Sequence, residues 1–383
     1  MPIKIIEADA MSKRIYADHA TTTPLMPKAL EAMLPFSKND VGNPSSLHGW
    51  TDLANKAIAE ARATIAECIN AEPEEIFFTS GGTEANEWVI KGSSGGILTS
   101  SYEHHAILNA VASEADKGRE VVSVRPKVGS GGGYIMPARL SKVWKDGIGL
   151  VSVMMANHEI GTINPIHLLS EFAHKQGALF HTDAVQAVGH IPIDVQEAGV
   201  DFLSASAHKF NGPKGIGFLY IRKGLKLEPL LKGGLQENGL QAETENVALI
   251  VGMATALKVN CERMNRNMLH LVNLTVCLCE GIDRIFPNAI YLGDGCMGQL
   301  PGFISVSFPG RSSEDVAQKL DLKGVTVSSG VVGNSKKTKM SHVLKAINAT
   351  NAIGFSTIRI TLGIENTLAD VEGILKALRV ALR

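Results

Sequence analysis

A lysine within a turn of small residues is the position in this sequence with the clearest capacity for covalent chemistry. Lys209 lies in SASAHKFNGPKGIG, residues 204–217, directly after an apolar segment that is expected to form a strand. A lysine amine that reaches from a strand end into a pocket loses hydration, which lowers its pKa and favours Schiff-base formation. The ordinary alternative is a solvated loop lysine, and this segment alone does not decide between the two.

An aspartate ends a second apolar segment, in HTDAVQAVG at residues 181–189. Burying the Asp183 carboxylate at the carboxyl end of a strand is costly unless the carboxylate is paired. Asp183 suits a partner role toward a pyridinium nitrogen, which keeps such a ring protonated as an electron sink. It equally suits the N-cap of a turn that begins at Ala184.

A third segment, FFTSGGTEAN at residues 77–86, predicts a strand, a small-residue turn and a helix. The free N–H groups at such a helix start can hold a phosphate. The segment has neither the ATP-type nor the dinucleotide glycine pattern, and a capping turn without ligand explains it about as well. Together, however, this cradle, Asp183 and Lys209 are the three groups that pyridoxal phosphate requires, and all would lie at the carboxyl ends of parallel strands.

Short apolar segments alternate with helical patterns through the first 246 residues. This alternation predicts an α/β fold with a mostly parallel central sheet that is sandwiched by helices. We expect strands at residues 75–79, 96–99, 120–124, 150–155, 179–182, 201–204 and 215–221, with helices between them, for example at 84–91, 105–116 and 168–176.

The pattern changes after Asn246. Residues 247–285 form one long or broken helical stretch, and strand-like and helical segments alternate beyond it, at 302–308, 313–320, 357–362 and 368–382. We therefore expect an N-terminal extension over residues 1–14, a large cofactor-binding domain over 15–260 and a smaller C-terminal α+β domain over 261–383.

The composition excludes several classes of function. The 383 residues include 37 basic and 38 acidic side chains, for a net charge of −1, which is not the charge pattern of a protein that binds nucleic acid or a membrane surface. The longest apolar run, residues 247–257, is far shorter than the roughly 20 residues of a membrane span, and the N-terminus does not resemble a signal peptide. Five scattered cysteines without a CxxC pair predict neither disulfides nor a metal site. We expect a cytoplasmic protein.

The sequence resembles the cysteine desulfurases, which are pyridoxal-phosphate enzymes of fold type I and aminotransferase class V. The matching segments run from about residue 14 to the end of the chain and include YADHATTTPL (16–25), SGGTEAN (80–86), EHHAIL (103–108), MMANHEIGTINPI (154–166), HTDAVQAVG (181–189), SASAHKFNGPKGIG (204–217), SHVLKAI (341–347) and TIRITLG (357–363). The resemblance implies pyridoxal 5'-phosphate as cofactor, a small amino acid as substrate, a homodimer, and a sulfur-acceptor protein as a further partner.

The resemblance also assigns roles to individual residues. Lys209 would carry the cofactor and move the substrate Cα proton, and His104 would stack on the cofactor ring and join in catalysis. Asp183 would pair with the ring nitrogen, and Arg359 would bind the substrate α-carboxylate by its two-pronged guanidinium. The other expected contacts are Asn157 and Gln186 to the phenolic oxygen, with Asn157 also near the substrate, and Gly82, Thr83, Ser206, His208 and, from the second subunit, Thr244 to the phosphate.

One loop departs from the family pattern. Residues 328–344 read SSGVVGNSKKTKMSHVL, and Gly333 stands where the family has its catalytic cysteine. None of the five cysteines lies on this loop. Asn238 and Gln241 replace two arginines of the family, and His158 stands where the family usually has asparagine. Glycine has no side chain that could take sulfur from a substrate, so persulfide formation at the usual loop is not expected.

Three functions follow from these features. The first is a desulfurase-like lyase that cleaves a C–S bond by β-elimination and needs no enzyme thiol. The second is other pyridoxal-phosphate chemistry, such as transamination, on another small amino acid. The third is an inactive cofactor-binding paralogue that serves as a partner in sulfur transfer. Retention of Lys209, Asp183, His104 and Arg359 argues against the third, and we expect an enzyme acting on a small, sulfur-containing amino acid.

Overall fold

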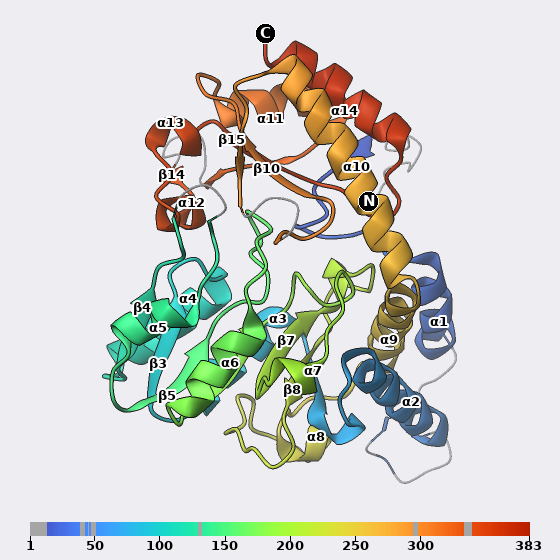
Figure 1. Ribbon diagram of the computed structural model, residues 1–383. Helices are drawn as coiled ribbons and strands as arrows, with labels where there is room; N and C mark the ends of the chain where they lie inside the picture. The colour runs from blue at the N-terminus through green and yellow to red at the C-terminus, as the bar shows by residue number, and fades with distance from the viewer. Residues whose placement is uncertain are drawn as a thin grey trace, which may run out of the picture.

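A seven-stranded sheet forms the centre of the larger part of the molecule (Figure 1). The computed structural model describes residues 14–38, 43, 44, 46, 51–128, 132–293, 298–332 and 339–383, so Gly333 and Cys296 lie outside the described residues. The strand order is β2 (Ile76–Thr79), β8 (Gly217–Ile221), β7 (Phe202–Ser206), β6 (Leu179–Asp183), β5 (Ile148–Ser152), β3 (Gly96–Ser100) and β4 (Val121–Val124). Only β8 runs against its neighbours in this sheet, so the predicted mostly parallel sheet is confirmed.

Successive side chains of these strands enter two different cores. Phe77, Phe202 and Leu219 belong to a core on one face of the sheet, whereas Phe78 and Leu203 belong to the core on the other. Because side chains alternate along a strand, a strand that is covered on both faces is apolar throughout, which is the pattern that marked these segments in the sequence.

Helices cover both faces of the sheet. One face packs against α3 (Gly82–Gly92) and α4 (His105–Asp116). The other carries α2 (Thr51–Ile69), α5 (Pro137–Val143), α6 (Ile166–Lys175) and α9 (Val247–Glu262), with α1 (Pro27–Lys38) against α9 and the short α7 (Val195–Ala198) beside α6. The α/β architecture is therefore the one expected.

A smaller antiparallel sheet lies above the first in Figure 1. Its strand order is β12 (Ser328–Ser329), β15 (Thr357–Thr361), β10 (Phe303–Ser307) and β9 (Ile290–Leu292). A separate core joins this sheet to α10 (Met264–Ile285), α11 (Ser313–Leu322) and α14 (Leu368–Ala381). The predicted long helical stretch is broken at Arg263, between α9 and α10.

The first described residues pair with elements near the end of the chain. β1 (Ile15–Tyr16) runs parallel to β11 (Val325–Thr326), and Asp18 forms a bridge with Thr361. The segment after β1 then contacts β15 of the smaller sheet through Thr361 and, at Ala20, the side chains of Gln186 and Lys209, which follow β6 and β7. The short elements that remain are α8 (Gln236–Gly239), the hairpin of β13 (Val331–Val332) and β14 (Lys339–Met340), α12 (His342–Ala346) and α13 (Asn351–Gly354).

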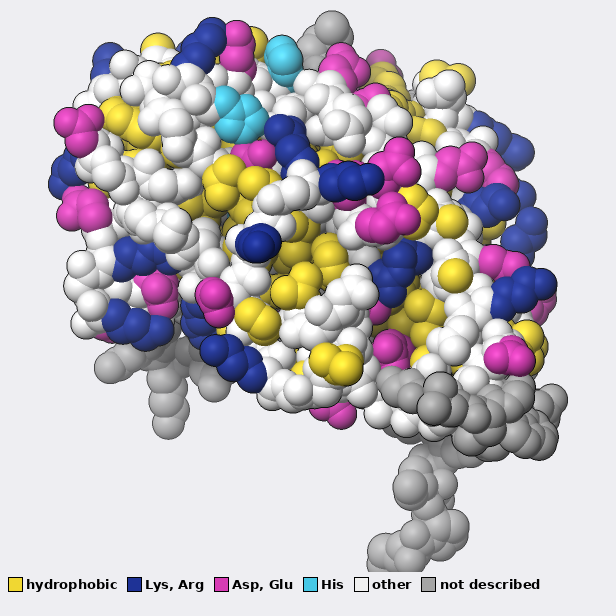
Figure 2. Space-filling view, turned by 90° about the horizontal axis from the view of Figure 1, so that it is seen from below, with side chains coloured by type: hydrophobic (Ala, Val, Ile, Leu, Met, Phe, Trp, Pro, Cys, Tyr) yellow, Lys and Arg dark blue, Asp and Glu magenta, His cyan; other side chains and the backbone are white. Residues whose placement is uncertain are grey.

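Charges of both signs are mixed with hydrophobic side chains on the face that Figure 2 shows. No helix among the described residues is both long and apolar enough to cross a membrane.

Candidate active site

A cavity of about 660 Å³ opens at the carboxyl ends of β6 and β7, beside the start of α3. This is the edge at which parallel α/β sheets bind ligands, and the volume suits a cofactor together with a small substrate. All but two of the predicted site residues line it: Gly82, Thr83, His104, Asp183, Gln186, Ser206, His208, Lys209 and Arg359.

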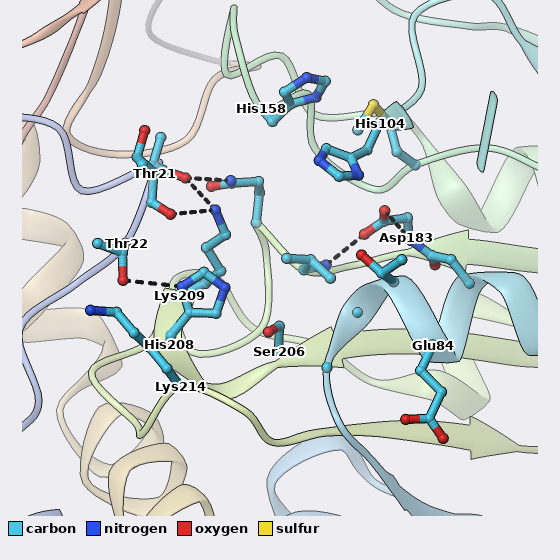
Figure 3. Close-up of a pocket in the computed structure, with 18 of the residues that line it drawn as sticks. Thr21, Thr22, Glu84, His104, His158, Asp183, Ser206, His208, Lys209 and Lys214 are labelled. Atoms are coloured by element: carbon cyan, nitrogen blue, oxygen red, sulfur yellow. Dashed lines mark hydrogen bonds between the residues drawn. The ribbon is translucent and has the colours of Figure 1, made fainter. Parts of the chain in front are cut away.

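Lys209 follows β7 in a single helical turn, and its side chain enters this cavity (Figure 3). The Nζ atom donates to the backbone carbonyls of Ala20 at 2.6 Å and Thr21 at 2.9 Å. Burial is the main cause that lowers the pKa of Lys209 to about 8, and the charge of Arg359 adds to it. The lysine is therefore not a solvated loop residue, and its amine is neutral in a larger fraction than that of an exposed lysine.

Asp183 is the last residue of β6, and its carboxylate has two protein partners. Oδ2 accepts a hydrogen bond from Asn86 Nδ2 at 2.7 Å, and Oδ1 accepts one from the Val185 backbone at 3.0 Å. Burial raises the pKa of Asp183, against the opposing influence of His104. The Val185 contact confirms that the carboxylate caps the following turn, while pairing of Asp183 with a ring nitrogen stays a prediction for a carboxylate that lines the cavity.

Glycines let the start of α3 approach the sheet closely. A Cβ atom on Gly82 would lie 2.6 Å from Val185 Cγ2, and one on Gly217 would lie 2.8 Å from Gly81 Cα. The first backbone N–H groups of α3 have no partner within the helix and are directed to its N-terminal end. Anions bind well at such a position, and the side chain of Ser206 reaches the same part of the cavity.

Three imidazoles border the cavity, and those of His104 and His208 lie apart in Figure 3. His208 lies near Ser206, and its Nδ1 is 3.1 Å from Thr22 Oγ1. His104 caps α4, and its Nδ1 accepts the Ala106 N–H at 3.1 Å, which leaves the hydrogen of the neutral ring on Nε2. Burial lowers the pKa of both rings, that of His208 to about 4.

Arg359 reaches the cavity from β15 of the smaller sheet. One terminal nitrogen donates to Asp18 Oδ1 at 2.8 Å, to Thr21 Oγ1 at 2.8 Å and to Ser328 Oγ at 3.0 Å. The other donates to the backbone carbonyl of His158 at 2.6 Å. The guanidinium is thus held firmly beside Lys209, in a position from which it could meet an anionic substrate group.

Asn157 and Thr244 do not line the cavity. The Asn157 side chain is fully buried, and its oxygen accepts the backbone N–H groups of Glu159 and Ile160. Thr244 is exposed and borders a separate hollow formed by residues 230–244. Thr244 was expected to contact the phosphate in the site of a second subunit, which is not part of this structure. This contact and the expected contact of Asn157 with the cofactor stay predictions.

Four residues with contacts in the site had no predicted role. Asp18 and Thr21 hold Arg359, Asn86 holds Asp183, and His158 lines the cavity. The motifs that contain them, YADHATTTPL, SGGTEAN and MMANHEIGTINPI, were recognised in the sequence. Their individual contacts depend on segments far apart in the chain, which the motifs do not reveal.

The donor set fits pyridoxal phosphate. An amine with a lowered pKa, a buried carboxylate, an imidazole ring and a helix start with a hydroxyl group border one cavity. These are the groups that could attach the aldehyde, pair with the ring nitrogen, cover the ring and bind the phosphate.

A family model described as aminotransferase class V matches residues 15–374. The chain belongs to aminotransferase class V. A relative named cysteine desulfurase IscS, from Dictyoglomus turgidum, is 43% identical over 375 residues, which cover 96% of this chain and 94% of the relative. The family match and this relative together make the protein a pyridoxal-phosphate enzyme of the cysteine desulfurase-like group.

Solved structures agree with this assignment. A NifS-like protein superposes with a TM-score of 0.89 at 35% identity, covering 96% of this chain and 98% of that protein. A structure of SspA in complex with cysteine superposes with a TM-score of 0.80 at 31% identity, covering 92% of this chain and all of that one. The expected fold of type I for this class V enzyme is confirmed.

Proposed function

We propose that this enzyme cleaves the C–S bond of a small sulfur-containing amino acid, such as L-cysteine, by β-elimination. The observation that carries the proposal is Gly333, which occupies the position of the catalytic cysteine in the resemblance. The cavity-lining residues, as far as the structure describes them, include no cysteine either. The described cysteines lie on α2, α9 and α10. A class V site that retains its lysine, aspartate and arginine can therefore start the reaction but has no thiolate at the usual place to take the sulfur.

Four residues that line the cavity have separate roles in the proposed reaction. Arg359 binds the substrate α-carboxylate, which orients the Cα–H bond toward Lys209. Lys209 Nζ takes the Cα proton, since a neutral amine is required for this step and burial favours that form. Asp183 would pair with the ring nitrogen of the cofactor, and His104 would cover its ring. When bound, pyridoxal phosphate supplies the electron sink that stabilises negative charge at Cα.

The overall reaction balances without an oxidant or an enzyme thiol. The Cα–H and Cβ–S bonds of L-cysteine break, and sulfur leaves with the electron pair of the Cβ–S bond. Water then replaces the amino group of the three-carbon product. The sum is L-cysteine and water giving pyruvate, ammonia and hydrogen sulfide.

A second copy of the chain completes the site in this proposal. Leu235 is 90% exposed and Leu231 is 44% exposed, on the same segment that leads to Thr244. Apolar side chains this exposed are typical of a protein interface. The homodimer would cover them and carry Thr244 to the phosphate in the neighbouring cavity. In this assembly the large domain, residues 15–260, supplies most cofactor contacts, and the small domain, 261–383, supplies Arg359.

Product analysis tests the proposal. The purified protein is incubated with pyridoxal phosphate, L-cysteine and a reductant, and pyruvate, alanine and sulfide are quantified. Pyruvate equal to sulfide, abolished by Lys209→Ala, supports β-elimination. Alanine equal to sulfide would mean that another thiol serves as acceptor and that the proposal is wrong.

A restored cysteine provides a matched variant. Gly333→Cys should shift part of the product from pyruvate to alanine, because a thiol again stands at the acceptor position. In Gly333→Ser the new side chain is similar in size to cysteine, but its hydroxyl is a poor nucleophile near neutral pH. This variant should leave pyruvate as the main product.

A further inference from the structure

His158 lines the cavity, and the reaction described so far gives it no task. Its side chain is 15% exposed and borders the same space as Lys209 and Arg359. The buried Nδ1 atom has no hydrogen-bond partner among the described residues, and Nε2 lies 3.8 Å from Glu159 Oε1. A buried polar atom without a partner is unfavourable, and in a residue that lines a cavity it points to a functional role for the side chain.

The backbone of His158 is fixed at the substrate end of the site. Asn157 Oδ1 accepts the N–H groups of Glu159 at 2.9 Å and Ile160 at 3.0 Å, which closes a tight turn around His158. The His158 carbonyl accepts a hydrogen bond from Arg359 at 2.6 Å. The backbone that carries the imidazole is therefore tied to the group that would bind the substrate carboxylate.

The His158 ring also contacts the histidine that is expected to cover the cofactor. The ring centroids of His158 and His104 are 5.4 Å apart, with an angle of 78° between the planes. Figure 3 shows both rings at the end of the cavity away from Ser206 and His208. His158 thus contacts both Arg359, the expected substrate anchor, and His104, the residue expected to cover the cofactor ring.

The imidazole is neutral in this environment. Burial is the main cause that lowers the pKa of His158 well below its usual range, and the nearby charges of His104, Arg359, His342 and Lys209 act in the same direction. The described histidines of this region do not form a metal-binding group. A neutral imidazole still carries one N–H, and it can stabilise a developing anion by donating a hydrogen bond.

We propose that His158 is a further catalytic residue, whose imidazole donates a hydrogen bond to the sulfur as it leaves the substrate. This inference rests on the proposed β-elimination. The Cα–H bond breaks and its proton goes to Lys209, while the Cβ–S bond breaks and its electron pair leaves with sulfur as hydrosulfide. The hydrogen bond stabilises that charge, and the proton that Lys209 took passes through water to the hydrosulfide, which completes hydrogen sulfide and returns Lys209 to its neutral form.

Leaving groups of different basicity test the role. Chloride is a far weaker base than hydrosulfide and needs no donor, so β-chloro-L-alanine should react independently of His158. With L-cysteine, His158→Phe should lower kcat by about 100-fold, the size expected for losing one donor to a developing anion. With β-chloro-L-alanine, kcat should change by less than about threefold, within the range of indirect effects.

Two further variants and one separate measurement test whether the slower reaction of His158→Phe results from a disturbed structure. His158→Gln keeps an amide N–H and should recover part of the L-cysteine rate. His105→Phe changes a neighbouring histidine that does not line the cavity, and both substrates should react as in the unchanged enzyme. Exchange of the Cα hydrogen of L-alanine in D₂O reports on proton removal by Lys209 without any leaving group and should persist in His158→Phe.

The outcomes separate this inference from the proposed function. If the unchanged enzyme forms alanine from L-cysteine, the proposed function fails. If it forms pyruvate from both substrates and His158→Phe slows both equally, or stops Cα exchange, His158 acts on structure or binding and the inference is overturned. Selective loss of the L-cysteine reaction supports it.

Discussion

The carboxylate of Asp18 and the guanidinium of Arg359 meet at 2.8 Å inside the candidate active site. Each side chain is only 12% exposed, and the two residues lie 341 positions apart. Ser328 Oγ donates to the same carboxylate oxygen at 2.9 Å. The N-terminal segment therefore sets the orientation of the arginine that we expect to bind the substrate carboxylate.

Asp18→Asn should weaken substrate binding more than catalysis. The amide keeps the shape of the side chain but loses the negative charge that holds Arg359. A charge-assisted hydrogen bond contributes about 1.5–3 kcal/mol. The KM for L-cysteine should therefore rise about tenfold or more. Steady-state kinetics and the affinity for L-alanine measure the effect. Ser328→Ala removes a neutral contact of the same nitrogen and should change KM less. A fall in kcat alone would contradict a positioning role for Asp18.

The attachment of pyridoxal phosphate to Lys209 should depend on pH with a midpoint near 8. Burial disfavours the charged amine and lowers its pKa to about 8, so the reactive neutral form increases as the pH rises through this value. Stopped-flow absorbance after mixing the cofactor-free protein with pyridoxal phosphate measures the rate. Arg359→Gln removes the second cause of the lowered pKa and should move the midpoint upward. A midpoint near that of an exposed lysine would show that the amine is solvated.

Glu103 should make the protein less stable as the pH rises toward 8. The side chain is fully buried, accepts the Met154 N–H at 3.0 Å, and has one oxygen without a partner among the described residues. Burial raises the pKa of Glu103 to about 8, so the folded state binds a proton that the unfolded state releases near pH 4.5. The stabilisation from this proton is complete below that lower pH and is lost as the pH rises through 8.

Glu103→Gln tests this prediction. The amide is neutral at every pH, so the variant should gain stability relative to the unchanged protein between pH 5 and 8, by at most about 1.4 kcal/mol per pH unit. Urea unfolding at a fixed protein concentration measures the difference. A difference that does not change with pH would mean that the buried carboxyl is ionised or that its environment opens.

Gly82→Ala should weaken cofactor binding, and a second substitution should restore it. The added Cβ would lie 2.6 Å from Val185 Cγ2, so the Val185 side chain must rotate, or the start of α3 or the turn after Asp183 must move. Both segments border the expected phosphate and ring positions, and we expect at least about a tenfold loss of pyridoxal phosphate affinity, or roughly 1.4 kcal/mol. Val185→Ala removes the clashing methyl group, so the double variant should bind more tightly than Gly82→Ala. Equal weakening in both would mean that the clash is not the cause.

The sequence predicted the central sheet well because its strands are covered on both faces. All seven strands lie where apolar runs had indicated, although β5 ends at Ser152 instead of near residue 155. Beyond Ser152 the chain still pairs with the strand next to it, as Met155 donates to the Asp183 carbonyl, but it turns to form a wall of the cavity. A run of apolar residues does not reveal such a change of direction.

Site residues could be predicted from the sequence where a single motif contains both the functional group and the strand that positions it. Lys209, Asp183 and the helix start at Gly82 each follow a predicted strand, and parallel strands bring such ends together. The contacts of Asp18 and His158 were not predictable, because each depends on Arg359 from the other sheet. Asn157 illustrates the converse, since its motif is intact while its side chain is engaged with the backbone of its own turn.

The pairing of β1 with β11 has a consequence for biosynthesis. The ribosome synthesises the chain from its N-terminus. Ile15 and Tyr16 therefore cannot pair with Val325 and Thr326 until most of the chain has been made. Lys209 and Asp183 can be placed early by the central sheet, but Arg359 emerges near the end and only then can meet Asp18. Because such distant contacts form late in folding, a nascent chain should acquire its cofactor pocket before it acquires substrate affinity.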